Sequence, residues 1–180
     1  GSFDNQIRDA ITKLSHIHFV AHTEFAKRLI YDLGEDANRV HVVGAPGLDN
    51  LVDLPAYEEC GPIRKRFICT YHPATLEPET GIHALIEALD RFPDYEQIWT
   101  GVNNDPGSDE ISNALSGKTI AHYSPREYVL ACRHSACVVG NSSSGIIEAP
   151  MLEVPTVNVG TRQDGRPCGP SIFCAYNDVE

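Results

Sequence analysis

The 180-residue sequence lacks the features of a membrane protein and of a nucleic-acid-binding protein. No apolar run approaches the about 18 residues of a membrane-spanning helix. The polar opening FDNQIRDAITK has no signal-peptide pattern and no initiator Met precedes it, so we expect a piece of a longer protein. Basic residues are few, since 14 Lys and Arg stand against 25 Asp and Glu and give a net charge of −11. We therefore expect no membrane and no nucleic-acid partner, although a small phosphorylated ligand needs only local donors.

Metal-binding and disulfide patterns are also missing. The six cysteines include no C-x-x-C pair, and the eight histidines show no H-E-x-x-H spacing. Cys69 and Cys137 lie in apolar, strand-like runs, where a reduced cysteine behaves as a small hydrophobic residue. We expect mostly buried or incidental thiols and no metal, with a disulfide or metal site as the less favoured alternative.

Short apolar runs alternate with amphipathic segments along the chain. The predicted strands cover residues 16–22, 40–46, 67–71, 97–101, 119–122, 136–140 and 155–159, and the predicted helices residues 4–14, 24–33, 80–92, 109–115, 125–132 and 144–151. This alternation predicts an α/β fold, a Rossmann-like parallel sheet with helices on both faces. The segment from Gly47 to Arg66 breaks the pattern with Leu-Pro and Gly-Pro steps, which predicts a linker, placed at residues 51–66.

Polar loops follow the strands of the second part of the chain. Ligands bind open parallel sheets at the carboxyl ends of the strands, so we expect these loops to meet at one edge. They contain His72, Asn103 to Asp105, Tyr123 and Ser124, Asn141 to Gly145, and Gly160 to Arg162.

The serine-rich segment GNSSSGIIEAP, residues 140–150, is the sharpest of these loops. Small residues let a phosphate approach the backbone, and serine hydroxyls and the first N–H groups of a helix donate to it. Glu148, one turn into that helix, would repel a phosphate but can accept hydrogen bonds from two ribose hydroxyls. The alternative, held at equal weight, is a serine-capped helix without a ligand.

Other strand-end residues are ambiguous when taken singly. Arg162 can reach the same anion with a forked guanidinium, or it is a solvated surface residue. His72, before Pro73, is a ligand contact or merely orders its loop. Asn103 and Asp105 lie in a loop whose composition is typical of plain turns.

Together these residues resemble the hydrolysing UDP-N-acetylglucosamine 2-epimerases, which supply N-acetylmannosamine for sialic acid and capsule synthesis. The matching stretches follow the family's order and span nearly the whole chain: IRDAITKLSH, HFVAHTEFAKRLIYDLGED, RVHVVGAPGLDNL, TYHPATLE, VNNDPGS and GNSSSGIIEAP with PTVNVGTRQDGR. Two positions depart from the family. Asp9 stands where many relatives have His, and Thr-Gly-Val precedes Asn103 where an aromatic residue and a Pro are more usual.

The resemblance implies half of a two-domain fold of the glycosyltransferase-B type. Residues 1–50 would be the tail of the N-terminal Rossmann-like domain and residues 67–180 the C-terminal UDP-binding domain without its last helices. The implied catalytic residue is His72, near the sugar and phosphate. The implied UDP contacts are Ser142 and Ser143 at the diphosphate, Glu148 at the ribose, Arg162, Asn103 in a loop beside the nucleotide, and Ser124, with Tyr123, beside the base.

The implied reaction turns UDP-N-acetylglucosamine, or a related UDP-acetamido sugar, into N-acetylmannosamine or its analogue plus UDP. A base removes the C2 proton while UDP leaves C1, and water then adds back with inversion at C2. The resemblance implies a cytoplasmic enzyme without metal or redox cofactor, and a homodimer is common in the family. We expect the acid and base carboxylates outside this chain, so the chain alone should bind UDP without turnover. The alternative is a UDP-sugar-dependent glycosyltransferase of the same fold.

Overall fold

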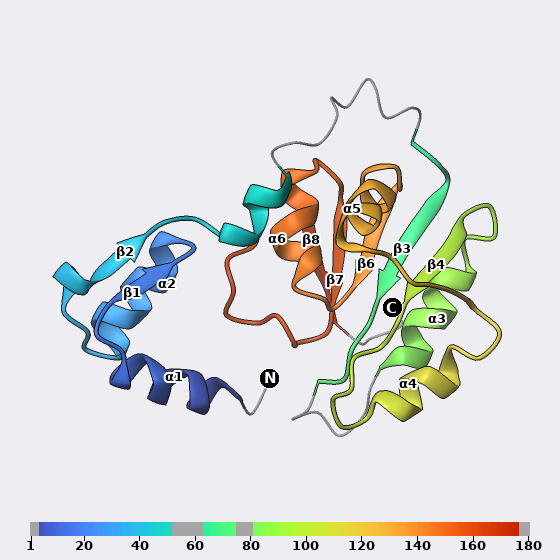
Figure 1. The fold of residues 1–180 in the computed structure, drawn as a ribbon. Coiled ribbons are helices and arrows are strands. Elements are labelled where there is room, and N and C mark those ends of the chain that lie inside the picture. Colours follow the sequence, from blue (N-terminus) through green and yellow to red (C-terminus); the bar gives the residue numbers. More distant parts are fainter. Residues whose placement is uncertain (1–3, 52–62, 75–80, 177–180) are drawn as a thin grey trace. The chain divides into compact units, whose positions relative to one another are not determined.

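A computed structural model describes residues 4–51, 63–74 and 81–176 and divides the chain into two compact units, residues 2–54 and 55–180 (Figure 1). The first unit holds a short parallel pair, β1 (His18–Val20) and β2 (Val40–Val42). Its helices are α1 (Asp4–Leu14), α2 (Thr23–Lys27) continued by a π-helix (Arg28–Asp32), and two 3₁₀ helices (Ala37–Arg39 and Pro46–Leu51). Most of the predicted linker, residues 52–62, lies outside the described residues.

The second unit is a six-stranded sheet in which every neighbouring pair is parallel. Its strands are β3 (Arg66–Thr70), β4 (Glu96–Thr100), β5 (Thr119–Ala121), β6 (Cys137–Gly140), β7 (Thr156–Val159) and β8 (Ile172–Ala175). Their order across the sheet is β5-β4-β3-β6-β7-β8. When the six strands are renumbered from 1 to 6 along the chain, starting at β3, this order becomes 3-2-1-4-5-6. That is the strand order of a Rossmann fold, which confirms the predicted fold class. The chain reverses its winding between β3 and β6, so a ligand crevice is expected there.

Helices lie on both faces of this sheet (Figure 1). They are α3 (Ile82–Asp90) and α4 (Ser108–Ala114) on one face, and α5 (Pro125–Arg133) and α6 (Ser144–Met151) on the other. Central strand β3 is buried on both sides: Phe67 and Cys69 pack with Trp99, Leu85 and Ile111 in the main core, and Ile68, on the opposite face, has no exposed surface. A strand covered on both faces reads as a continuous apolar run, and FIC in β3 has this form.

Three local features differ from the sequence prediction. Strand β8 was not predicted, because it is short, half-exposed and preceded by a segment rich in Gly and Pro. Helix α2 is capped by His22, whose Nδ1 accepts a hydrogen bond from the Glu24 N–H, and not by Thr23. The predicted helix 24–33 changes to π-helical geometry at Arg28.

The cysteines in the described part of the chain are free thiols. Cys69 and Cys132 are buried, and burial raises the pKa of each to about 12. Such thiols stay protonated and unreactive at neutral pH, as expected of core residues. Cys60 lies outside the described residues. In the part of the chain that the structure describes, no helix is long and apolar enough to cross a membrane.

Candidate functional site

The candidate site lies where β3 and β6 end side by side. Thr70 pairs with Gly140 in the sheet, and the chain then continues into His72 on one strand and Asn141 on the other. Gly140 has a φ of +135°, and a Cβ atom there would lie 1.9 Å from the Thr70 carbonyl oxygen. Only glycine therefore allows the two strand ends to approach this closely.

Asn141 joins the loops at this edge. Its side-chain Oδ1 accepts a hydrogen bond from the His72 N–H at 2.7 Å, and its Nδ2 donates to the His72 carbonyl at 2.7 Å. Its backbone carbonyl accepts from Arg162 Nη1 at 3.3 Å and from Gln163 Nε2 at 2.7 Å. Asn141 is only 1% exposed, and it brings the predicted residues His72 and Arg162 to the same point of the sheet edge.

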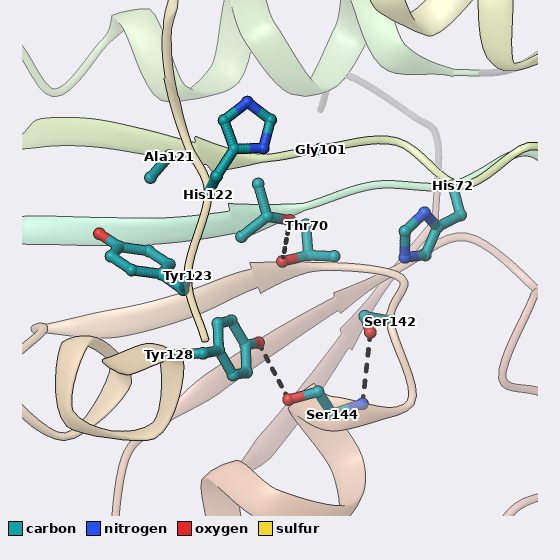
Figure 2. A pocket seen from close by; sticks show the side chains of 10 residues that line it. Thr70, His72, Gly101, Ala121, His122, Tyr123, Tyr128, Ser142 and Ser144 are labelled. Atoms are coloured by element: carbon teal, nitrogen blue, oxygen red, sulfur yellow. Dashed lines mark hydrogen bonds between the residues drawn. The ribbon is translucent and has the colours of Figure 1, made fainter. Parts of the chain in front are cut away.

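A pocket of about 350 Å³ opens beside this point (Figure 2). Three of the predicted residues, His72, Tyr123 and Ser142, contribute to its wall. The full lining is Thr70, His72, Thr100, Gly101, Ala121, His122, Tyr123, Tyr128, Ser142 and Ser144. In Figure 2, His72 and Ser142 lie at one end of the pocket and Ala121 and Tyr123 at the other. The pocket thus runs along the carboxyl ends of β3, β4 and β5, where the sequence predicts a ligand.

His72 is uncharged at neutral pH. Burial lowers its pKa to about 4, helped by the positive charge of Arg162 and opposed by Asp105. The ring Nδ1 accepts a long hydrogen bond of 3.4 Å from the Asn103 N–H. With Nδ1 as the acceptor, the proton of the neutral ring is on Nε2, which makes Nε2–H a donor.

The serine turn leads into α6 at the same edge. Ser143 is the N-cap residue but makes no side-chain capping bond, and Ser144 Oγ bonds to the Tyr128 hydroxyl at 2.9 Å. Ser142 Oγ accepts from the Ser144 N–H at 3.4 Å. The N–H groups of Ser144, Gly145 and Ile146 already donate within the chain, to Ser142 Oγ and to the Ser142 and Ser143 carbonyls. The turn nevertheless carries the positive end of the α6 dipole. This turn can therefore accept an anion.

The remaining predicted residues have different surroundings. Glu148, on α6, has a buried Oε2 with no hydrogen-bond partner among the described residues. Asn103 Nδ2 donates to the Asp105 carboxylate, while its own buried Oδ1 lacks a partner there.

Ser124 is occupied by helix capping. Its N–H and Oγ both donate to Glu127 Oε2, at 2.8 and 2.7 Å, and its carbonyl accepts from the Tyr128 N–H. Ser124 forms the capping box of α5, so its polar groups already have partners within the chain.

Sequence reasoning gave no role to several site residues. Asn141 was recognised only as part of a polar loop, although a polar residue between a buried strand and a serine turn is a usable signal. Thr70 and Thr100, the last residues of β3 and β4, share a 2.8 Å hydrogen bond in the pocket wall. Tyr128 was read only as part of a helix. No cluster of three or more His, Cys, Asp or Glu suited to a metal ion occurs within residues 4–51, 63–74 and 81–176.

Comparison with known proteins relates this geometry to a family. A family model described as UDP-N-acetylglucosamine 2-epimerase matches residues 1–180. The chain belongs to this family. A UDP-N-acetylglucosamine 2-epimerase of Neisseria meningitidis serogroup B is 38% identical to it, over 100% of this chain and 51% of the relative. A GDP/UDP-N,N'-diacetylbacillosamine 2-epimerase (hydrolyzing) of Campylobacter jejuni is 32% identical, over 92% of this chain and 48% of the relative.

A solved structure has the same fold. The UDP-GlcNAc 2-epimerase of Methanocaldococcus jannaschii, in complex with UDP-GlcNAc and UDP, matches with a TM-score of 0.67 at 14% identity. The match covers 93% of this epimerase-family chain and 52% of that one. The chain spans about half the length of the curated relatives it matches.

Proposed function

We propose that the chain is the UDP-binding part of a hydrolysing UDP-N-acetylglucosamine 2-epimerase. The enzyme would convert UDP-N-acetylglucosamine, or a related UDP-acetamido sugar, into N-acetylmannosamine or its analogue plus UDP. The observation that supports this best is the convergence of His72, the Ser142 turn and Arg162 on the β3–β6 crevice. Two donors, His72 and Arg162, and the N-terminus of α6 around one crevice suit a diphosphate. The uridine and the sugar are inferred from the family to which the chain belongs.

The proposed chemistry requires a diphosphate to leave the sugar C1 as a base removes the proton at C2. The Arg162 guanidinium and the positive end of the α6 dipole would stabilise the charge on the departing phosphate. Neutral His72 would donate its Nε2–H to the same group without holding the product as tightly as an imidazolium does. No step of this reaction needs a metal or redox cofactor, so we expect EDTA to leave the turnover unchanged.

The nucleotide site can be tested with the 180-residue chain itself. Isothermal titration with UDP should give weak binding, and His72→Ala and Arg162→Ala should each weaken it roughly tenfold, the effect of losing a hydrogen bond to a charged group. His83→Ala and Arg91→Ala are matched controls, because both residues are exposed on or beside α3, away from the pocket lining. Unchanged affinity in both site variants would place the ligand elsewhere.

The reaction is tested with a protein of the relatives' full length that carries this chain. Incubation with UDP-N-acetylglucosamine should release free N-acetylmannosamine and UDP in equal amounts. We propose that the acid and base carboxylates lie outside this chain, so the chain alone should release neither product. Transfer of the sugar to an acceptor, without free N-acetylmannosamine, would indicate a glycosyltransferase instead. A cytoplasmic location and a homodimer belong to the same proposal, and light scattering of the longer protein checks the second.

A further inference from the structure

The Asn141 side chain bonds to both backbone polar groups of one residue, the proposed ligand contact His72. The two bonds are 2.7 Å each, one accepted by Oδ1 and one donated by Nδ2. His72 lies beyond the last residue of β3, and Pro73, which follows it, has no N–H to donate. The strand ladder therefore stops before His72, and the Asn141 amide fixes the direction in which this backbone, and with it the imidazole, projects.

The backbone of Asn141 makes a second set of connections. Its N–H donates to the Thr70 carbonyl at 3.0 Å, and its own carbonyl accepts from Arg162 and Gln163. Every polar group of this buried residue has a partner, which offsets the cost of burying an amide. One residue thus connects the loops after β3, β6 and β7.

We propose that Asn141 is a positioning residue of the nucleotide site, which holds the His72 imidazole and the Arg162 guanidinium side by side so that both donate to one diphosphate. This role rests on the proposed function. Asn141 does not itself line the pocket, so its effect on the ligand passes through His72 and Arg162. A buried apolar residue would satisfy the packing of this corner equally well, but it would leave the His72 backbone without its partners.

A double-mutant cycle tests the route of the effect. Asn141→Leu keeps the volume and removes both bonds to His72, so UDP should bind roughly tenfold more weakly. Asn141→Leu keeps the backbone carbonyl that accepts from Arg162 and removes only the side-chain bonds to His72. The Asn141→Leu/His72→Ala double variant should therefore bind like His72→Ala alone. Asn158→Leu is the matched control, since Asn158 is 3% exposed on β7 and bonds only weakly to Cys174 Sγ at 3.8 Å. Unchanged affinity in Asn141→Leu, or losses that add fully, would overturn the proposal.

A second measurement needs no nucleotide. The His72 imidazole signal, assigned by its absence in His72→Ala, can be titrated by NMR in each variant. The native His72 pKa of about 4 should rise towards the ordinary 6.5 in Asn141→Leu, because the released ring leaves its buried place beside Arg162 and Asp105. In Asn158→Leu it should stay near 4, and an unmoved pKa in Asn141→Leu would refute the positioning role even if UDP bound as proposed.

Asn141→Asp covers the case in which Asn141→Leu does not fold. It keeps the shape of the side chain and the acceptor for the His72 N–H, but it places a carboxylate oxygen against the His72 carbonyl oxygen. We expect the same weakening of UDP binding and the same non-additivity with His72→Ala, and additive losses would overturn the proposal. If the parent chain binds no UDP but the His72 pKa rises in Asn141→Leu, the proposed function is wrong, while the positioning of His72 by Asn141 is confirmed.

Discussion

At the scale of single residues, His72 is held neutral by its surroundings. Its pKa in the folded chain is about 4, below the ordinary 6.5, because it is partly buried and Arg162 lies nearby. Between these two values the unfolded chain takes up a proton that the folded chain does not. The folded state is therefore not penalised above pH 6.5, and it is penalised increasingly as the pH falls towards 4.

This penalty can be measured by urea unfolding at pH 7 and pH 4.5. The parent chain should lose about 1–2 kcal/mol more stability over this interval than His72→Asn does, after allowance for solvent screening of a partly exposed ring. Comparing the two proteins cancels the titration of the carboxylates. Equal losses in both would mean that His72 titrates normally in the folded chain.

A substitution at Glu148 can separate the contacts to the ribose of UDP from those to its diphosphate. Its Oε2 is buried without a partner among the described residues, which leaves an acceptor for a sugar hydroxyl. Glu148→Gln should weaken UDP binding several-fold, roughly the value of one charge-assisted hydrogen bond. It should not weaken the binding of inorganic pyrophosphate, because the lost carboxylate only repels a phosphate. Arg162→Ala should weaken both ligands. Weaker pyrophosphate binding in Glu148→Gln would contradict a contact to the ribose.

At the scale of elements, the strand–turn–helix β6–α6 depends on two glycines. A Cβ atom on Gly140 would collide with the backbone carbonyl of Thr70 on the neighbouring strand β3. A Cβ atom on Gly145 would lie 2.9 Å from the Thr156 methyl group. The first contact is with backbone, which cannot rotate away as a side chain can. The close approach of β3, β6 and the serine turn therefore needs Gly140 in particular.

Gly140→Ala should consequently destabilise the chain strongly, by roughly 3 kcal/mol or more, through backbone displacement. Gly117→Ala is the matched control, because Gly117 also has a positive φ, +85°, but a Cβ atom there meets nothing within 4 Å. It should cost only about 1–2 kcal/mol of left-handed strain. Denaturant midpoints of the two variants check this, and similar losses would show that the Thr70 contact relaxes easily.

At the scale of the whole molecule, the candidate site lies within the unit formed by residues 55–180. UDP at about 100 times its dissociation constant should stabilise the unit that binds it by about 2.7 kcal/mol. Hydrogen exchange should then slow at the ends of β3 and β6 and in the first turn of α6, while β1 and β2 remain unchanged. Protection confined to β1 and β2 would place the nucleotide on the other unit.

Local pattern was sufficient to predict most of the elements. The cap of α5 at Ser124, the span of α6 and the buried run of β3 are short-range features, set by capping chemistry and hydrophobic period. Edge strand β8 has too few buried side chains to give a period, and it was missed. The parallel direction of β3 to β7 was predicted from the alternation of strands and helices, because parallel neighbours need a crossover connection, which is usually a helix.

The sequence by itself determined which polar residues follow each strand, because strand ends are marked by local composition. Only the tertiary structure decided which of them act together, since β3 and β6 are separated by about 70 residues and become neighbours through sheet order. The role of Asn141 was not predicted for the same reason, because its partners His72 and Arg162 lie 69 and 21 residues away in the sequence. Hydrogen bonds between strand-end loops depend on long-range pairing, and no local period records them.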